Sequence, residues 1–417
     1  MRPMKLTTIA FSMIGLSFAL AQLIDGKPTS PTGYEIELAE IHKQIGRLND
    51  GMSRAPSEEA IRTPYLLYRR AALTGGVEDF MIAEAAIDEG IRRFGPSDDF
   101  YLLKANLDLK LHRLPGVKRA LAMLPSRASN AQVRTMKADI AFQEGRYDDA
   151  RKAYESVIEG SRAWDRLARL AYLKSKTGDP LGADRLYEQA EEELSAKEMR
   201  SYAWIELQRG LLELNRGRYE NARAHYERAN RAYSGYWLVD EYRAELFGAE
   251  GKFAEAAALY RGVIVQAPHP EFLQELADLY SFAGKSEEAT LWYEKALAAY
   301  LESARRGEVH YYHHLASFYA DVRQDGAEAI QWARKDLELR RNYSTWEAFA
   351  WALYRDGKFA EALDAINQAL CCGIEDAHLY FHAAMIHLAA GRTSEGKRLL
   401  IRAGEINPRF ENFHVHR

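Results

Sequence analysis

Histidine is the residue type in this chain most suited to chemistry, and many of its histidines lie toward the C-terminal end. The 417-residue sequence holds 12 of them. The spacing of His310, His313 and His314 would place all three on one face of a helix. Imidazole pairs at this spacing can bind Zn²⁺, Ni²⁺ or Cu²⁺. Further histidines follow at His382, His387, His414 and His416.

The sequence lacks the motifs that would make a defined metal centre of these histidines. The metalloprotease pattern HExxH is absent. The only two cysteines, Cys371 and Cys372, are adjacent, which is the wrong spacing for a zinc finger or a disulfide scaffold. We therefore expect packing and surface roles for the histidines and predict no metal ion and no cofactor. A metal-handling role of the His-rich C-terminal third stays open as an alternative.

Catalytic motifs are missing as well. The sequence contains no GxSxG, no phosphate-cradling GxxxxGK[ST] and no GxGxxG in a strand context. Acidic pairs such as Glu287 and Glu288 fall on repeating helix faces, where solvated surface is the simplest interpretation. We therefore predict that the protein is not an enzyme.

The elements that would position these side chains are best seen at 346–370. This stretch predicts two amphipathic helices joined by a turn at Asp356-Gly357-Lys358, with small residues where the helices touch: Ala350, Ala362 and Ala369. The pattern recurs along the chain, and a glycine marks each turn. These glycines are Gly145, Gly178, Gly217, Gly251, Gly284, Gly357 and Gly391. With an irregular unit at 310–341 and two weaker units before Gly145, the pattern predicts about ten helical hairpins.

The hairpins resemble the tetratricopeptide repeat family. The intervals between the first five glycines are 33, 39, 34 and 33 residues, near the 34-residue period of that family. The unit around Gly251 matches the family pattern at Ala244, Phe247, Gly251, Phe253, Ala256, Tyr260 and Pro268. The resemblance implies an all-α, right-handed α-solenoid over residues 62–410, with the first helix of each hairpin lining a concave groove where partners bind.

Counting from the turn glycines places particular side chains in that groove. Tyr172 falls in its early part. An apolar middle follows at Trp204, Leu207 and Leu211, then an acidic stretch at Glu241, Glu245, Gln274 and Asp278 that favours basic partners. Packing between repeats is the alternative for the Trp204 cluster. The residues predicted to bind a partner are Trp204, His310, His313, Glu347, Trp351, Tyr354, Arg355 and His378.

A well-known peptide site of the family is a clamp of Lys, Asn and Arg residues that grips an acidic C-terminus. The corresponding positions here hold mostly neutral or acidic residues, among them Thr135, Ala168, Glu241 and Glu347. This difference argues against a chaperone-docking role. The net charge of −4 and the lack of a dense basic field also argue against nucleic acid as a partner.

The N-terminus predicts export. Arg2 and Lys5 precede an apolar run over 6–20, and Ala19 and Ala21 have the spacing of a cleavage site. We expect a signal peptide at 1–21, removed in the mature chain, with an uncleaved anchor as the alternative. Residues 22–61 would hold a leader and an amphipathic helix near 34–48, and 411–417 a tail. No later segment predicts a membrane span.

These observations lead to one main hypothesis and two alternatives. The main one is a non-catalytic scaffold of the bacterial envelope, in the periplasm, that binds a partner protein or peptide in the concave groove. The alternatives are a periplasmic metal-handling accessory and a structural subunit of a secretion or polysaccharide-export assembly. The sequence does not identify the partner or the oligomeric state.

Overall fold

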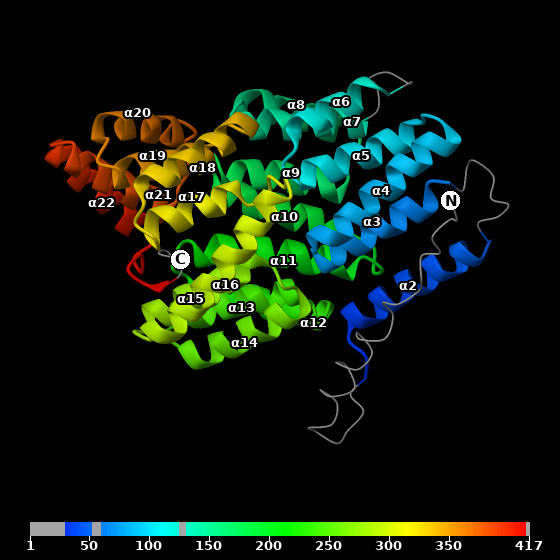
Figure 1. Cartoon of the computed structure of the whole chain (residues 1–417), viewed down its shortest axis with the longest axis horizontal. Coiled ribbons are helices and arrows are strands. Elements are labelled where there is room, and N and C mark those ends of the chain that lie inside the picture. Colours follow the sequence, from blue (N-terminus) through cyan, green and yellow to red (C-terminus); the bar gives the residue numbers. More distant parts are fainter. Residues whose placement is uncertain (1–29, 52–59, 125–130, 414–417) are drawn as a thin grey trace, which may run out of the picture.

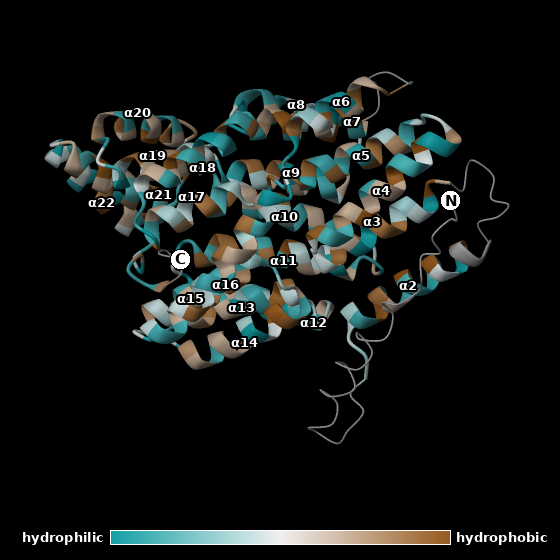
Figure 2. Cartoon of the chain, viewed as in Figure 1, coloured by the Kyte–Doolittle hydropathy of each residue, from teal (hydrophilic) through white to brown (hydrophobic). Residues whose placement is uncertain are grey.

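The protein is built from helices alone over the part of the chain that the structure describes. The computed structural model describes residues 30–51, 60–124 and 131–413. These hold 21 helices and no strand. The predicted signal peptide, most of the leader, His414 and His416 lie outside the described residues. Hydrophobic and hydrophilic residues alternate along the helices (Figure 2), and no described helix is long and apolar enough to cross a membrane.

The helices after the first form ten consecutive hairpins, as the fold prediction requires (Figure 1). The first helix, α2 (Gly33–Gly51), precedes them and packs against α3. The hairpins are α3 (Arg62–Thr74) with α4 (Val77–Phe94), α5 (Asp98–Lys110) with α6 (Leu114–Ala122), α7 (Ala131–Gln143) with α8 (Tyr147–Gly160), α9 (Trp164–Ser175) with α10 (Pro180–Glu192), α11 (Met199–Leu214) with α12 (Tyr219–Ala232), α13 (Trp237–Ala249) with α14 (Phe253–Gln266), α15 (Pro270–Phe282) with α16 (Ser286–Arg305), α17 (Tyr312–Asp321) with α18 (Gly326–Leu339), α19 (Tyr343–Arg355) with α20 (Phe359–Leu370), and α21 (Ala377–Ala389) with α22 (Thr393–Ile406).

The predicted turn and crossing residues behave as the hairpin pattern requires. Gly357 has a φ of 75°, a left-handed conformation that glycine adopts without steric cost. The irregular eighth hairpin has no such glycine, and Gln324 takes the left-handed conformation there, with a φ of 53°. Ala350, Ala362 and Ala369 are fully buried. Small residues at the crossing therefore let the two backbones of the hairpin approach closely.

Tyrosines and one unexpected glycine complete the packing between hairpins. Tyr226 and Tyr260 are almost completely buried and belong to clusters that join one hairpin to the next. Gly396 stands where the repeat pattern expects alanine. A Cβ atom at this position would lie 2.6 Å from the Cγ of Leu388. Leu388 therefore occupies the space that an alanine side chain at position 396 would need.

The array coils so tightly that its second superhelical turn touches its first. The backbone N–H of Arg341 donates to the carbonyl of Gln143 at 2.9 Å, and the side chain of Asn342 donates to the Gln143 side chain at 2.8 Å. Gln143 ends the first helix of the third hairpin, and Asn342 precedes the ninth. In Figure 1 the yellow to red helices α17–α22 accordingly return alongside the cyan and green helices α7–α11.

The same kind of contact repeats along the chain, and we call this line of contacts the seam. Tyr233 donates to Glu37 at 2.6 Å, the Trp237 indole donates to the Leu73 carbonyl at 3.0 Å, and Asn412 donates to the Tyr219 hydroxyl at 3.1 Å. A Cβ atom added to Gly178 would lie 2.2 Å from the Gly373 carbonyl oxygen. The seam residues are Glu37, Leu73, His112, Gln143, Tyr147, Gly178 and Tyr219 on one side, and Tyr233, Trp237, His310, Arg341, Asn342, Tyr343, Gly373 and Asn412 on the other.

Candidate functional site

A cavity of about 370 Å³ opens between the first helices of the last four hairpins. We call it the groove cavity, because the first helices are the ones expected to line the groove. Four helices supply almost all of its wall, namely α15, α17, α19 and α21. The lining residues are Gln274, Asp278, His313, Ser317, Asp321, Val322, Glu347, Ala348, Trp351, His378, Phe381 and His382.

Each of these helices contributes residues four positions apart, which lie on the same helical face. Glu347 and Trp351 come from α19 and His378 and His382 from α21. The stacking of α19 beside α21 then brings the two pairs together, although about 30 residues separate them in the chain. The helical period places the two residues of each pair on one face, and the repeat period places the two faces side by side.

Trp351, which was predicted to bind a partner in the groove, is part of the cavity wall but is largely buried. Its side chain is 8% exposed. The indole N–H donates to Asp321 at 2.7 Å, and the ring stacks on His382 with centroids 3.8 Å apart. The ring also stacks on Tyr354 with centroids 4.6 Å apart. These contacts fix the His382 ring in one orientation.

Glu347, His378 and His382 form a compact cluster at one end of the groove cavity. One possible ligand atom from each residue can be chosen so that all three lie within 4.8 Å of one another. Oε1 of Glu347 lies 3.3 Å from Nδ1 of His382. Removal from water raises the pKa of the Glu347 carboxyl to about 7, against the opposing effect of His378.

The other residues predicted to bind a partner have varied surroundings. His313 lines the groove cavity beside Glu347, with its Nδ1 3.6 Å from Asp336 Oδ2. Tyr354 packs behind Trp351, and Arg355 donates to the Ala320 carbonyl at 2.7 Å, so neither lines the cavity. Trp204 packs edge-on against Tyr187 in the hydrophobic cluster between two hairpins, which matches the packing alternative.

His310 is not on a helix face with His313 and His314, because α17 begins only at Tyr312. It lies in the seam instead, stacked on His112 with ring centroids 4.9 Å apart. Three predicted groove positions are also buried, namely Leu207, Glu241 and Glu245, at 0%, 5% and 0% exposure. The two glutamates therefore cannot act as an exposed acidic surface that steers basic partners. Helical spacing alone did not reveal that neighbouring elements cover these residues.

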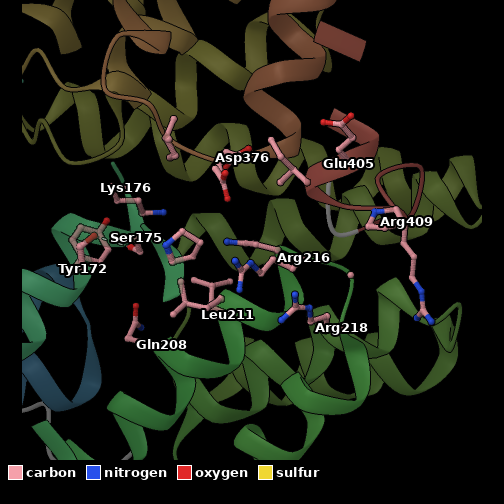
Figure 3. Close-up of a pocket in the computed structure, with 18 of the residues that line it drawn as sticks. Tyr172, Ser175, Lys176, Gln208, Leu211, Arg216, Arg218, Asp376, Glu405 and Arg409 are labelled. Atoms are coloured by element: carbon pink, nitrogen blue, oxygen red, sulfur yellow. Dashed lines mark hydrogen bonds between the residues drawn. The ribbon is translucent and has the colours of Figure 1, made fainter. Parts of the chain in front are cut away.

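A second cavity, of about 470 Å³, lies where the two superhelical turns meet. Figure 3 shows its labelled side chains on both walls. Tyr172, Leu211 and Arg216 belong to the fourth and fifth hairpins, whereas Asp376, Glu405 and Arg409 belong to the tenth. Tyr172, which is 38% exposed, and Leu211 provide apolar surface. We call this space the seam cavity, because it exists only where the second turn closes over the first.

Cationic side chains outnumber acidic ones around the seam cavity. Three acidic residues line it, which are Glu375, Asp376 and Glu405. Five cationic residues line it, which are Lys176, Arg216, Arg218, Arg402 and Arg409. Arg402 pairs with Glu375 and Glu405, and Arg218 lies 3.5 Å from Glu213. Arg409 lies over the Tyr219 ring at 4.3 Å. The side chains that line the cavity thus carry a surplus of two positive charges. Glu213, outside the lining, offsets part of it by pairing with both Arg216 and Arg218, and the remaining positive charge suits an acidic group.

Two sets of site residues escaped the sequence reasoning. His382 was noted as a histidine but not placed in the groove, although its spacing of four from His378 was a readable signal. The cations of the seam cavity come from hairpin turns and from the last hairpin. Counting groove positions along consecutive first helices cannot find them.

The comparisons with known proteins agree with the repeat architecture. Models described as tetratricopeptide repeat match residues 117–165 and 207–270, and another match covers 270–302. The TPR repeat-containing protein YpiA of Bacillus subtilis is 26% identical over 177 residues, which are 42% of this chain and 40% of that protein. The chain therefore spans about 40% of the length of this curated relative. Tetratricopeptide repeats are thus present in the chain.

Solved structures similar to this one have low sequence identity. The Cut9–Hcn1 hetero-tetramer of the APC/C has a chain 16% identical, with a TM-score of 0.42, covering 95% of this chain and 78% of that one. Yeast Tom70 is 13% identical with a TM-score of 0.41, over 89% of this chain and 92% of that one. The ten stacked hairpins define the class, an all-α helical solenoid, and the family models identify tetratricopeptide repeats over part of it.

Proposed function

We propose that the protein is a non-catalytic scaffold that holds an extended, acidic segment of a partner protein on the inner face of its superhelix. The seam cavity is the anchor point. The observation that carries the proposal is the surplus of cations in its lining beside apolar side chains, the exposed Tyr172 and the half-buried Leu211. A space of about 470 Å³ accommodates side chains or a chain end, not a folded domain.

Charge and shape have separate roles in this proposal. Arg218, whose side chain is 53% exposed, and Arg409 would attract the acidic segment and raise the rate of association. Tyr172 and Leu211 would supply contact area once the segment is seated. Binding should therefore weaken as ionic strength rises, because part of the attraction acts through solvent.

Peptide selection tests the proposal. Random peptides displayed on phage are selected against the purified full chain, and the recovered peptides should be rich in Asp and Glu. Arg216→Glu combined with Arg218→Glu should weaken a selected peptide at least about tenfold, equivalent to about 1.4 kcal/mol. Arg185→Glu, an exposed arginine on α10 that does not line the cavity, should bind like wild type. Selected peptides without acidic character, or equal binding by the double variant, would contradict the proposal.

We also propose that the scaffold works in the bacterial envelope, most simply in the periplasm. The support is the basic, apolar and small-residue order of 1–21. Mass spectrometry of the protein from an osmotic-shock fraction of its native cells should find a chain that begins at Gln22. Recovery only from the cytoplasm, with the N-terminal segment intact, would refute this location.

A further inference from the structure

We infer that Glu347, His378 and His382 form a binding site for a divalent first-row transition metal ion, with Zn²⁺ the best match to the donor set. Two imidazoles and one carboxylate are a donor set that proteins use for zinc, with the fourth position left to water. The absence of thiolate and the presence of nitrogen donors favour Zn²⁺, Cu²⁺ or Ni²⁺ over Mg²⁺ and Ca²⁺.

The backbone arrangement already brings the donors to the required separation. Zinc-bound nitrogen and oxygen atoms at about 2.0–2.2 Å from the ion lie roughly 3.4 Å apart in a tetrahedron. Oε1 of Glu347 and Nδ1 of His382 are 3.3 Å apart. His378 lies one helical turn before His382, with ring centroids 4.0 Å apart. Small side-chain rotations therefore suffice to complete the set.

The surroundings support the donors as a metal site requires. Trp351 stacks on the His382 ring and is itself held by its hydrogen bond to Asp321. The Glu347 side chain is 16% exposed, and its buried Oε1 accepts no hydrogen bond from the described residues. A carboxylate oxygen in that position is costly unless a cation or a donor reaches it. A metal ion between the three side chains would satisfy it.

The site is open enough for an ion to enter and to keep a water ligand. The groove cavity of about 370 Å³ lies directly against the three donors. Other residues of its wall, such as His313 and Ser317, could accept or donate a hydrogen bond to that water. The seam cavity, where we place the partner segment, has none of these residues in its lining. The metal inference therefore stands apart from the proposed function.

Titration with the metal alone tests the inference. The full chain is stripped with a chelator, dialysed and titrated with Zn²⁺ against a chromogenic competitor. One ion should bind per chain, and Glu347→Gln or His378→Gln should weaken binding at least about tenfold. His42→Gln, an exposed histidine on α2, is the matched control and should leave the affinity unchanged. His414→Gln combined with His416→Gln should also bind like wild type.

A spectroscopic readout separates a defined site from adventitious binding. Trp351 stacks on His382, so Cu²⁺ at the site should quench its fluorescence, and Trp351→Phe should lose that part of the quenching. Circular dichroism checks that each variant is folded, and Glu347→Gln keeps the side-chain shape if a histidine variant fails. Zn²⁺ binding that survives both Glu347→Gln and His378→Gln, or that disappears with the 414 and 416 histidines, would overturn the inference.

Discussion

Four histidines of the C-terminal third form two pairs with different chemistry. His378 and His382 face the groove cavity beside a carboxyl group. His310 and His314 lie near the seam, where removal from water lowers the pKa of each to about 4. A histidine whose pKa falls in the folded protein is held neutral, because the folded state disfavours its charged form.

Acid should therefore weaken the folded protein through His310 and His314. Their unfolded pKa is near 6.5 and their folded pKa about 4, so their stabilisation is complete above pH 6.5 and is lost between pH 6.5 and 4. Glu271 has its pKa lowered to about 2, so its own contribution is lost between pH 4.5 and 2, in the same direction. Charged or titratable neighbours of the two histidines are Glu271, His112, Lys110, His313, Arg340 and Asp336.

Urea denaturation between pH 7 and pH 4 measures this loss. We expect a decrease on the order of 1 kcal/mol per histidine, since one pKa unit corresponds to about 1.4 kcal/mol and both side chains keep some solvent contact. His314→Gln, which cannot be protonated, should flatten the pH profile. A wild-type profile that is level between pH 7 and pH 4 would show that these histidines do not titrate in this way.

At the scale of the element, one hairpin owes its geometry to its alanine positions. Ala362 on α20 is fully buried at the crossing with α19, whereas Ala360, two residues earlier, is exposed. The two residues share a helix and a chemical type but differ in environment. The same substitution at both positions therefore separates the effect of close helix packing on stability from the effect of helix propensity.

Ala362→Leu should lower the free energy of unfolding by roughly 1–3 kcal/mol, because a larger side chain has no space at the crossing. Ala360→Leu should change it by less than about 0.5 kcal/mol. Thermal or urea denaturation of the two variants beside wild type gives the comparison. Equal stabilities for both variants would mean that Ala362 does not sit at a tight crossing.

At the scale of the whole molecule, the seam decides the shape of the inner surface. In a solenoid without contact between superhelical turns, each repeat contacts only its neighbours, and no contact fixes the distance between the turns. Here hydrogen bonds link residues such as Gln143 and Asn342, 199 positions apart. The seam closes the groove into a restricted space and creates the seam cavity, which neither turn could form alone.

Two glycines provide a matched test of the seam. Gly178 and Gly357 have similar φ values, 80° and 75°, so alanine should cost each about 1–2 kcal/mol in backbone strain. Only at Gly178 would the new Cβ also collide with the second turn, 2.2 Å from the Gly373 oxygen. At Gly357 no outside atom lies within 4 Å.

Gly178→Ala should therefore destabilise the protein more than Gly357→Ala and should increase its radius of gyration. Denaturation measures the first effect and small-angle X-ray scattering the second. If both variants lose the same stability and keep the wild-type radius, then closure of the two turns is not a feature of the protein in solution.

The sequence by itself determined the repeating unit, because the requirements of a hairpin are local. The glycine at a left-handed turn, the alanine at a crossing and the apolar stripe of a helix each depend on neighbours within about 34 residues. The ten hairpins, the irregular unit at 310–341 and the helix near 34–48 could be predicted for that reason. Counting from the turn glycines also predicted that Glu347 and His378 lie in the groove, and both line the groove cavity.

Only the tertiary structure decided how the superhelix closes, because its pitch arises from small rotations that accumulate over about six hairpins. That closure moved His310 from the expected groove into the seam. It also brought Arg216 and Arg409 to one cavity from positions far apart in the chain. Helical spacing along the sequence also does not show which side chains the neighbouring helices bury. Leu207 and Glu245 have the spacing of groove residues, but the packing of the surrounding helices covers them.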